Sequence, residues 1–164
     1  MYDRAILLIR NPLDSFISEF NRLLGNSFEN APIEDWNQIQ DLDGRFLNKM
    51  YPRWNEFHEN ILVNFTKPLL IIEYNLLQEN AIGEMSRLIK FLNLDLKNET
   101  KTCLSKNLIG PYKRPKRPKH EMDQIIQKIR RENIDFYKDA YFGMLNRLKD
   151  NFRLSNGYLF PRKI

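Results

Sequence analysis

The sequence of 164 residues contains very little cysteine and histidine, and this scarcity excludes two classes of site. Cys103 is the one cysteine, so the chain can form neither an internal disulfide nor a zinc site built from cysteines. His58 and His120 are too few and too far apart in the sequence to predict a metal centre by themselves. We therefore expect no bound metal.

Long hydrophobic runs are also missing. A helix that crosses a bilayer needs roughly 20 apolar residues, and the longest apolar runs here, residues 5–9 and 69–72, have the length of short strands. The opening residues show neither a basic leader before an apolar stretch nor a small-residue cleavage site. We expect neither a membrane span nor a signal peptide in this sequence.

Acidic residues are fewer than basic ones: 21 Asp and Glu against 26 Lys and Arg leave a formal net charge of +5 and a pI near 9.3. This balance predicts an anionic partner, such as phosphate, nucleic acid, an acidic glycan or an anionic membrane surface. Hydrophobic residues make up 42% of the chain, which is typical of a folded protein. At this length we expect a single domain over residues 1–164.

Two apolar runs predict buried strands. Residues 5–9 and 69–72 are apolar at consecutive positions, which is typical of strands covered on both faces in a parallel sheet. Apolar residues at helical spacing predict helices over residues 16–24, 36–50 and 81–92, a helix that starts near Pro52 and continues to residue 62, and one or two helices over residues 122–148. The order of elements therefore predicts a helix-rich α/β fold with a short parallel sheet flanked by helices.

Details of these elements follow from individual residues. Asp14 or Ser15 is expected to cap the first helix. We assign the aromatic residues at helical spacing to the core: Phe16, Phe20, Trp36, Trp54 and Phe57. Residues 93–110 form a polar connection, and residues 152–164 an irregular tail. His58 is expected at the surface or at an interface.

Residues 111–120 form a basic segment with five Lys or Arg and three prolines, which predicts an extended loop. Three interpretations stay open: a solvated loop, a nuclear-import or nucleic-acid patch, and a polyproline ligand at 115–118. Basic residues elsewhere alternate with acidic ones, so we expect no nucleic-acid partner.

The segment from Arg10 to Ser18 carries the clearest chemical signal. Arg10 leaves the first predicted strand at an edge where parallel sheets bind ligands, and its guanidinium can bind a phosphate through two hydrogen bonds. Ser18 lies on the polar side of the following helix, with Arg22 one turn further along nearly the same side. Each residue alone is usually a surface group; together, eight positions apart with Asn11-Pro12 between them, they suggest an anion site.

This segment resembles the 3′-phosphate-binding motif of sulfotransferases that use 3′-phosphoadenosine-5′-phosphosulfate (PAPS). In that family an Arg at a strand end, often before Asn-Pro, and a Ser eight positions later hold the 3′-phosphate, which implies this role for Arg10 and Ser18. The chain is most similar to the sulfotransferase-like domain of WSC-domain-containing proteins, by residues 5–12, 19–22, Trp36 and Trp54, and by residues 157–162.

Two later segments extend the resemblance. Residues 70–74 and 84–92 are similar to a family strand and helix, which implies that Tyr74 approaches the adenine, although Asn75 and Leu76 depart from the family's Tyr-Glu-Asp-Leu turn. Lys113 and Arg114 stand where relatives carry a basic segment over the 3′-phosphate. The resemblance thus implies a site without a metal for PAPS, or for PAP (3′-phosphoadenosine-5′-phosphate, the same nucleotide without the sulfuryl group). This site would be formed by Arg10, Ser18, Tyr74, Lys113 and Arg114.

Family members carry a 5′-phosphosulfate loop and a catalytic base before the Arg-Asn-Pro motif, and residues 1–9 hold neither. We therefore expect the C-terminal portion of a sulfotransferase domain, part of a P-loop-type nucleotide-binding fold, and assign no catalytic residue. The resemblance implies sulfuryl transfer from PAPS to a hydroxyl of a glycan or similar acceptor. The alternative is a non-catalytic basic scaffold that binds anionic partners through residues 113–120.

The resemblance also bears on location. It implies the Golgi lumen, or attachment to a membrane through a segment outside this sequence, and leaves the cytoplasm open. Two glycosylation sequons, at Asn64 and Asn98, fit a lumenal location.

Overall fold

A computed structural model describes residues 3–25, 29–95, 97–106, 115–155 and 158–161. The chain divides into two compact units. The sheet unit contains residues 1–10, 61–110 and 144–164, and the helical unit contains residues 11–60 and 111–143. The single domain over residues 1–164 stays a prediction.

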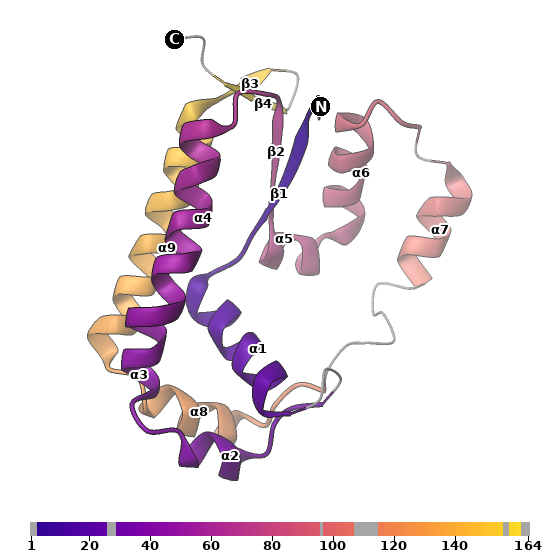
Figure 1. Ribbon diagram of the computed structural model, residues 1–164. Helices are drawn as coiled ribbons and strands as arrows, with labels where there is room; N and C mark the ends of the chain where they lie inside the picture. Colours follow the sequence, from indigo (N-terminus) through magenta and orange to yellow (C-terminus); the bar gives the residue numbers. More distant parts are fainter. Residues whose placement is uncertain (1–2, 26–28, 96, 107–114, 156–157, 162–164) are drawn as a thin grey trace. The chain divides into compact units, whose positions relative to one another are not determined.

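The sheet unit is built on two parallel strands, β1 (Ala5–Ile9) and β2 (Leu69–Glu73), which pair from Ala5 with Leu69 to Ile9 with Glu73 (Figure 1). The first four residues of β2 are buried, as their consecutive apolar side chains predict. The same prediction is wrong for β1, where Leu7 and Ile9 are buried and Ile6 and Leu8 are exposed, so only one face of this strand is covered. The helix-rich α/β fold with a short parallel sheet is confirmed.

The sheet continues into the C-terminal residues. Strands β3 (Phe152–Ser155) and β4 (Tyr158–Pro161) pair antiparallel, β4 also pairs antiparallel with β2, and the strand order is β1-β2-β4-β3. The predicted irregular tail is therefore wrong for these residues. Their pairing with each other and with β2 is a tertiary contact that a local apolar pattern does not reveal.

Three helices follow β2 in the sheet unit: α5 (Tyr74–Glu79), α6 (Ala81–Phe91) and α7 (Asn98–Lys106). The predicted helix 81–92 is confirmed, whereas α5 and α7 lie in segments expected to be a turn and a polar connection. Leu70 and Ile72 of β2 form a buried cluster with Phe91 of α6. The helix thus covers one side of the strand.

The helical unit begins with α1 (Pro12–Leu24), whose cap differs from the prediction. Asn11 is the N-cap residue, and its side chain accepts a hydrogen bond from the Leu13 amide at 2.9 Å. Asp14 and Ser15 lie inside the helix instead. Pro12 occupies the first turn, where its missing N–H is not needed, so the helix can start directly after Asn11.

The predicted helix 36–50 is interrupted. A short helix α2 (Ile33–Gln38) ends before Asp41, which has a left-handed backbone (φ 50°) and caps the next helix through the Gly44 amide. From there the chain stays helical through Pro52, in three successive elements: α3 (Leu42–Arg45), a π-helical turn η1 (Phe46–Met50) and α4 (Tyr51–Asn64).

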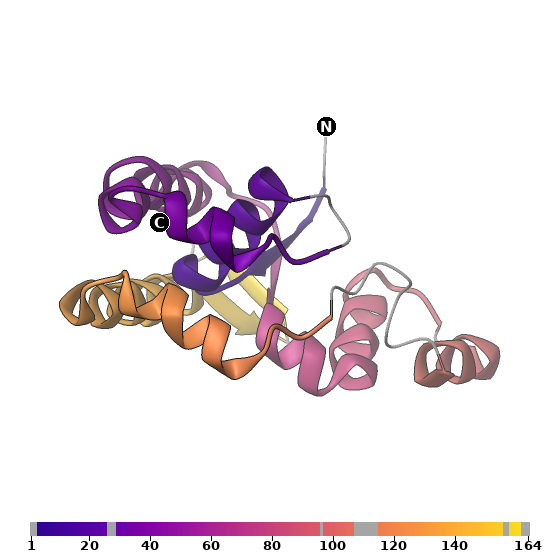
Figure 2. The ribbon, with the colours of Figure 1, turned by 90° about the horizontal axis from the view of Figure 1, so that it is seen from below.

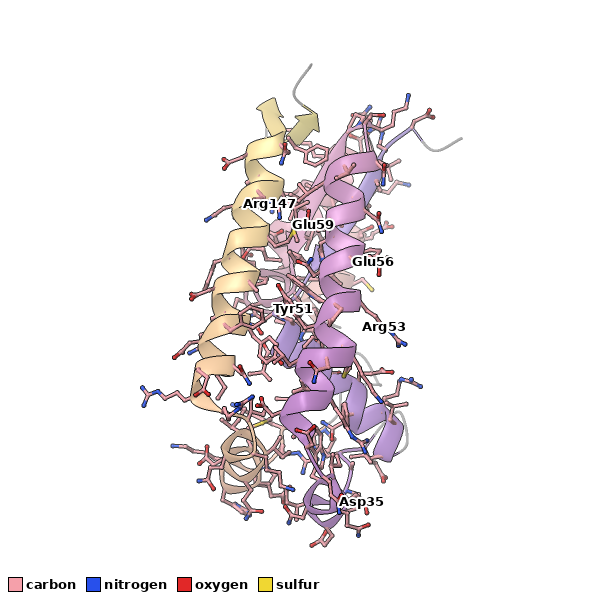
Figure 3. The ribbon with its side chains drawn as sticks, turned by 60° about the vertical axis from the view of Figure 1, so that its left-hand side comes forward. Asp35, Tyr51, Arg53, Glu56, Glu59 and Arg147 are labelled. Atoms are coloured by element: carbon pink, nitrogen blue, oxygen red, sulfur yellow. The ribbon has the colours of Figure 1, made fainter. Side chains whose placement is uncertain are left out.

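The π-turn explains how a helix passes Pro52. The Tyr51 amide donates to the Phe46 carbonyl, five residues earlier, so the hydrogen-bond register widens just before the residue that has no N–H. Along α4, Tyr51 points toward helix α9 (Arg131–Asn151), and Arg53 and Glu56 point away from it (Figure 3).

A mostly aromatic core holds the helical unit together. Phe16, Phe20 and Trp36 are buried as predicted, and the half-buried Trp54 packs against the same core. The assignment of Phe57 to the core is wrong, since 55% of this residue is exposed. Helix α8 (Lys119–Gln127) lies beside α2 (Figure 2), and the Lys128 ammonium that follows it donates to the Trp36 carbonyl at 2.7 Å.

Candidate functional site

Arg10 and Tyr74, two of the predicted site residues, meet at the carboxyl ends of β1 and β2. Each follows the last residue of its strand, and the register pairs those last residues, Ile9 and Glu73. The Arg10 guanidinium carbon lies 4.4 Å from the centre of the Tyr74 ring, a cation–π contact between two half-buried side chains. The parallel pairing thus brings a cation and an aromatic face to one edge of the sheet.

Two further polar contacts involve Tyr74 and its neighbour Glu73. The Gln78 side-chain amide, one turn into α5, donates to the Tyr74 hydroxyl at 3.1 Å. The Glu73 carboxylate pairs with the Lys149 ammonium of α9 at 2.9 Å, which compensates a negative charge close to a predicted anion site. Sequence reasoning missed Lys149, because 76 residues separate it from Glu73 and no local pattern links them.

Ser18 lies in α1, in the helical unit, and is half-buried. Phe16, Ile17 and Phe20 form the buried side of this helix, so Ser18 lies outside it. Arg10 belongs to the sheet unit. The convergence of Arg10 and Ser18 on one phosphate therefore stays a prediction.

Arg22, expected to add positive charge near Ser18, pairs with Glu19. Its Nε and Nη2 donate to the two carboxylate oxygens at 2.8 and 2.6 Å, and this hydrogen bonding raises the pKa of Arg22. The positive charge on this exposed side of α1 is thus compensated by a carboxylate of the same helix.

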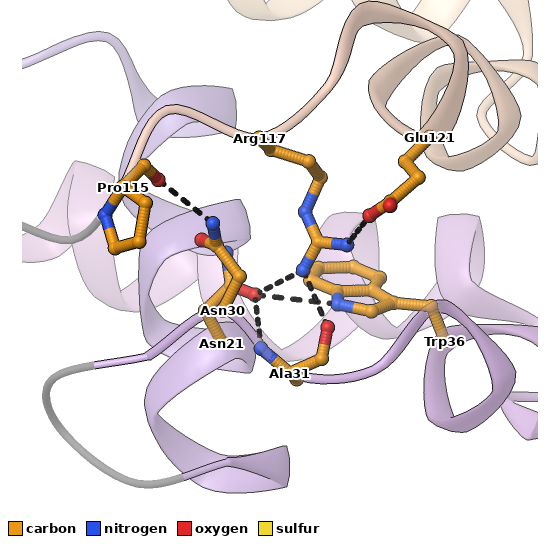
Figure 4. Close-up of polar contacts among 7 residues, drawn as sticks. All are labelled: Asn21, Asn30, Ala31, Trp36, Pro115, Arg117 and Glu121. Carbon is orange, nitrogen blue, oxygen red and sulfur yellow. Dashed lines mark hydrogen bonds and ion pairs between the residues drawn. The ribbon is translucent and has the colours of Figure 1, made fainter.

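The basic segment is only partly solvated. Lys113 and Arg114 lie outside the described residues, and α8 begins at Lys119, so the predicted loop ends at Pro118. The Arg117 guanidinium is buried and hydrogen-bonded to Asn21, Ala31 and Glu121 (Figure 4). The interpretation of residues 111–120 as an entirely solvated loop is wrong at Arg117.

His58, expected at the surface or an interface, is buried in the helical unit. Its Nδ1 lies 2.6 Å from the Trp54 carbonyl one turn earlier, and its ring packs against the Trp54 and Phe57 rings. Burial lowers the pKa of His58, and its Nε2 has no hydrogen-bond partner among the described residues. This environment is that of a packed side chain.

Over the described part of the chain, no three His, Cys, Asp or Glu side chains gather in a way that could hold a metal ion. Within the same ranges, no helix combines the length and apolar character required to cross a bilayer.

The comparisons with known proteins point to one family. The chain matches the sulfotransferase domain family over residues 3–141. A WSCD family member of Aedes aegypti is 31% identical over 121 residues, which are 71% of this chain and 37% of that protein. A WSCD family member of Drosophila melanogaster is 23% identical over 147 residues, 89% of this chain and 46% of that protein.

The chain thus spans less than half the length of these two relatives. No solved structure matches it. Both relatives agree with the predicted resemblance to WSC-domain-containing proteins. Because the family match covers most of the sequence and includes the Arg10–Ser18 segment and Tyr74, the chain belongs to the sulfotransferase domain family.

Proposed function

We propose that this chain binds the 3′-phosphate end of PAPS for a sulfotransferase whose acceptor is a hydroxyl of a glycan or a similar molecule. One observation carries the proposal: Arg10 stands at the carboxyl end of β1 with its guanidinium against the Tyr74 ring. In the proposed site Arg10 and Ser18 hold the 3′-phosphate, Tyr74 contacts the adenine, and Lys113 and Arg114 add positive charge.

The chemistry of Arg10 and Tyr74 fits such a nucleotide. A guanidinium offers parallel N–H donors that match two oxygens of a phosphate, and it keeps its charge at any physiological pH. The Tyr74 ring restricts the orientation of this guanidinium and offers an aromatic surface to a base. The ion pair of Glu73 with Lys149 lowers the repulsion that a bare carboxylate would exert on a phosphate.

The proposed residues bind and orient the donor and take no part in bond making. Bound PAPS supplies the sulfuryl group, and its transfer needs a general base for the acceptor hydroxyl and donors for the developing charge. We assign neither role to a residue of this chain. His58 is a poor candidate for the base, because it is buried between aromatic rings.

The proposed location is the Golgi lumen, or a membrane to which a segment outside this sequence attaches the protein. Asn64 and Asn98, the acceptor residues of the two sequons, are both exposed. Exposure is what a glycosylated asparagine requires, and it supports a lumenal location without being specific to it.

The second candidate is a non-catalytic scaffold that binds anionic partners through residues 113–120. Lys116, Lys119 and His120 are exposed and fit that function. Arg117 does not, because its guanidinium is already bonded inside the helical unit. The observations therefore favour the nucleotide site.

Calorimetric titration with PAP tests the proposal. We expect the wild-type protein to bind PAP, and Arg10→Ala to weaken binding by about 10- to 100-fold, the value of a charge-assisted hydrogen bond to a phosphate. Ser18→Ala removes one neutral donor, so we expect a smaller loss of about 3- to 10-fold. Arg53→Ala is the control, since it removes one exposed Arg of α4 that points away from α9 (Figure 3).

Heparin and DNA, titrated at two salt concentrations, separate the two candidates. A nucleotide site predicts that PAP binding depends on Arg10 and that heparin and DNA binding do not. A wild-type protein that binds heparin but not PAP would contradict the nucleotide site and support the scaffold.

A further inference from the structure

The Tyr74 side chain is held at two points, both within the sheet unit. The Arg10 guanidinium carbon lies 4.4 Å from the centre of its ring, and the Gln78 side-chain amide donates to its hydroxyl at 3.1 Å. The two contacts come from different elements, since Arg10 follows β1 and Gln78 lies in α5. A ring that is contacted at its face and bonded at its hydroxyl has little freedom to leave its rotamer.

The place of Gln78 in α5 brings its amide to this hydroxyl. Side chains four residues apart are neighbours on a helix, and each leans toward the helix N-terminus, so the side chain of Gln78 reaches back to Tyr74. Leu77, on the same side of α5, packs against the buried cluster that β2 and α6 form. The helix is thus attached to the sheet on the side that carries Tyr74 and Gln78.

The stability of α5 explains the Gln78 hydrogen bond poorly. The bond is exposed, and water competes for both groups, so it adds little to the stability of a helix. The helix has six residues, none of which is buried, and no side chain among the described residues caps its N-terminus. What the bond supplies is a defined orientation of the Tyr74 ring while the guanidinium lies against it.

A defined orientation matters for a ligand that contacts the ring. A side chain that moves among several rotamers in the free protein loses this freedom when a base packs on it, and the loss weakens binding. A ring that is already fixed avoids most of this cost. The hydrogen bond from Gln78 therefore favours binding without any contact between Gln78 and the ligand.

We propose that Gln78 is a positioning residue of the nucleotide site: by its hydrogen bond to the Tyr74 hydroxyl it fixes the ring that contacts the adenine, next to the guanidinium that binds the 3′-phosphate. The inference rests on the proposed PAP site. It assigns a function to an exposed residue outside the motifs that carry the family resemblance.

PAP titration of Gln78→Met tests this role. Methionine keeps the length of the side chain and its helix propensity, and it removes the amide. We expect PAP to bind about 2- to 5-fold more weakly, the value of one exposed neutral hydrogen bond. Gln124→Met replaces an exposed glutamine of α8, in the helical unit, and is the matched control that should bind PAP like the wild type.

A double-mutant cycle shows whether Gln78 acts through the Tyr74 hydroxyl. Tyr74→Phe keeps the ring and removes the group that accepts the hydrogen bond, so we expect it to weaken PAP binding at least as much as Gln78→Met does. In the Tyr74→Phe background, Gln78→Met should have no further effect on PAP affinity. An equal loss in both backgrounds would contradict this route.

A ligand without a base distinguishes positioning of the ring from a general loss of structure. Ribose 3,5-bisphosphate, measured by competition with PAP, carries both phosphates and no adenine. We expect Gln78→Met to leave its affinity unchanged and Arg10→Ala to weaken it. Equal weakening of both ligands by Gln78→Met would show that the variant disturbs the whole site, and the inference would be wrong.

The outcomes separate the two claims. A wild-type protein without PAP affinity overturns the proposed function and this inference with it. PAP affinity that Arg10→Ala weakens and Gln78→Met leaves unchanged overturns this inference alone. Should Gln78→Met fail to fold, as measured by circular dichroism, Tyr74→Phe tests the same bond from its other end, and unchanged PAP affinity in that variant overturns the inference.

Discussion

The His58 side chain is held in place by other residues of its own helix, α4. The Trp54 carbonyl one turn earlier accepts from Nδ1, if that nitrogen carries the proton, and two aromatic rings of α4 cover the imidazole. Burial disfavours the charged form, and this is the cause of its lowered pKa. The folded protein therefore binds a proton at His58 less readily than the unfolded chain, in which histidine protonates at mildly acidic pH.

The lowered pKa of His58 makes the stability of the protein depend on pH. As the pH falls through about 6.5, the ordinary pKa of an exposed histidine, the unfolded chain binds protons at His58 more readily than the folded protein does, so stability falls as the pH falls. We expect the free energy of unfolding to decrease between pH 7 and 5 by at most about 1.4 kcal/mol per pH unit from this group, the limit for one proton. Urea denaturation at several pH values measures it.

His58→Leu removes the titrating group and should abolish this part of the pH dependence. His120→Gln is the matched control, because it removes the other, exposed histidine. Equal loss of the pH dependence in both variants would show that His58 is not its source.

Individual site residues differ in how far the sequence reveals them. Arg10 and Tyr74 stand out because each follows an apolar run of strand length. Their contact needed the register of two strands about 60 residues apart, which only pairing decides. Arg117 looks like any basic residue between prolines, and its burial depends on partners in α1 and in the loop before α2.

At the scale of elements, the start of α1 depends on its cap. The Asn11 side chain accepts from the Leu13 amide, and the Ser15 hydroxyl donates to the Asn11 carbonyl at 3.0 Å. The Asn-Pro pair thus does two things: the amide caps the helix, and the proline occupies a first-turn position that needs no N–H.

We expect Asn11→Ala to lower the free energy of unfolding by about 1 kcal/mol, the usual cost of losing an N-cap acceptor. Asn11→Asp keeps the acceptor and places a negative charge at the helix N-terminus, so it should cost much less. Urea denaturation followed by tryptophan fluorescence reports the change, because Trp36 is fully buried in the same unit. Equal losses in the two variants would contradict capping by the side chain.

The helix from Asp41 to Asn64 shows why element boundaries are hard to predict. Pro52 suggests a new helix, since proline removes a donor. The π-turn before it rearranges the hydrogen bonds, so the helix continues. Asp41 does the opposite: its left-handed backbone interrupts a segment whose apolar spacing looks continuous.

At the scale of the whole molecule, the C-terminal residues complete the sheet. Strand β4 pairs with β2 at Leu69 and Leu159, and Phe152, the first residue of β3, is 2% exposed. Deletion of residues 152–164 therefore removes a pairing partner of β2 and a buried aromatic side chain.

We expect that truncation to lower the stability of the sheet unit by about 3–5 kcal/mol, the cost of losing a buried Phe. Amide hydrogen exchange should accelerate by at least about 10-fold near Leu69, because the pairing with β4 is lost while β1 still pairs with β2. Truncation after Pro161 is the control, because it leaves all four strands intact. Unchanged exchange in the shorter protein would show that β4 does not stabilise β2.

Local sequence patterns are enough to predict the parallel strands, the helices α1 and α6 and the Arg10–Ser18 motif. Each of these features is specified by an apolar run or an apolar periodicity over a few neighbouring residues, because each element needs only to bury one side. Four other features follow only from how the chain folds in three dimensions: the pairing of β3 and β4, the contact of Arg10 with Tyr74, the burial of His58 and the hydrogen bonds of Arg117. Each of these depends on groups far apart in the chain, whose meeting is set by packing and by the need to satisfy buried polar atoms.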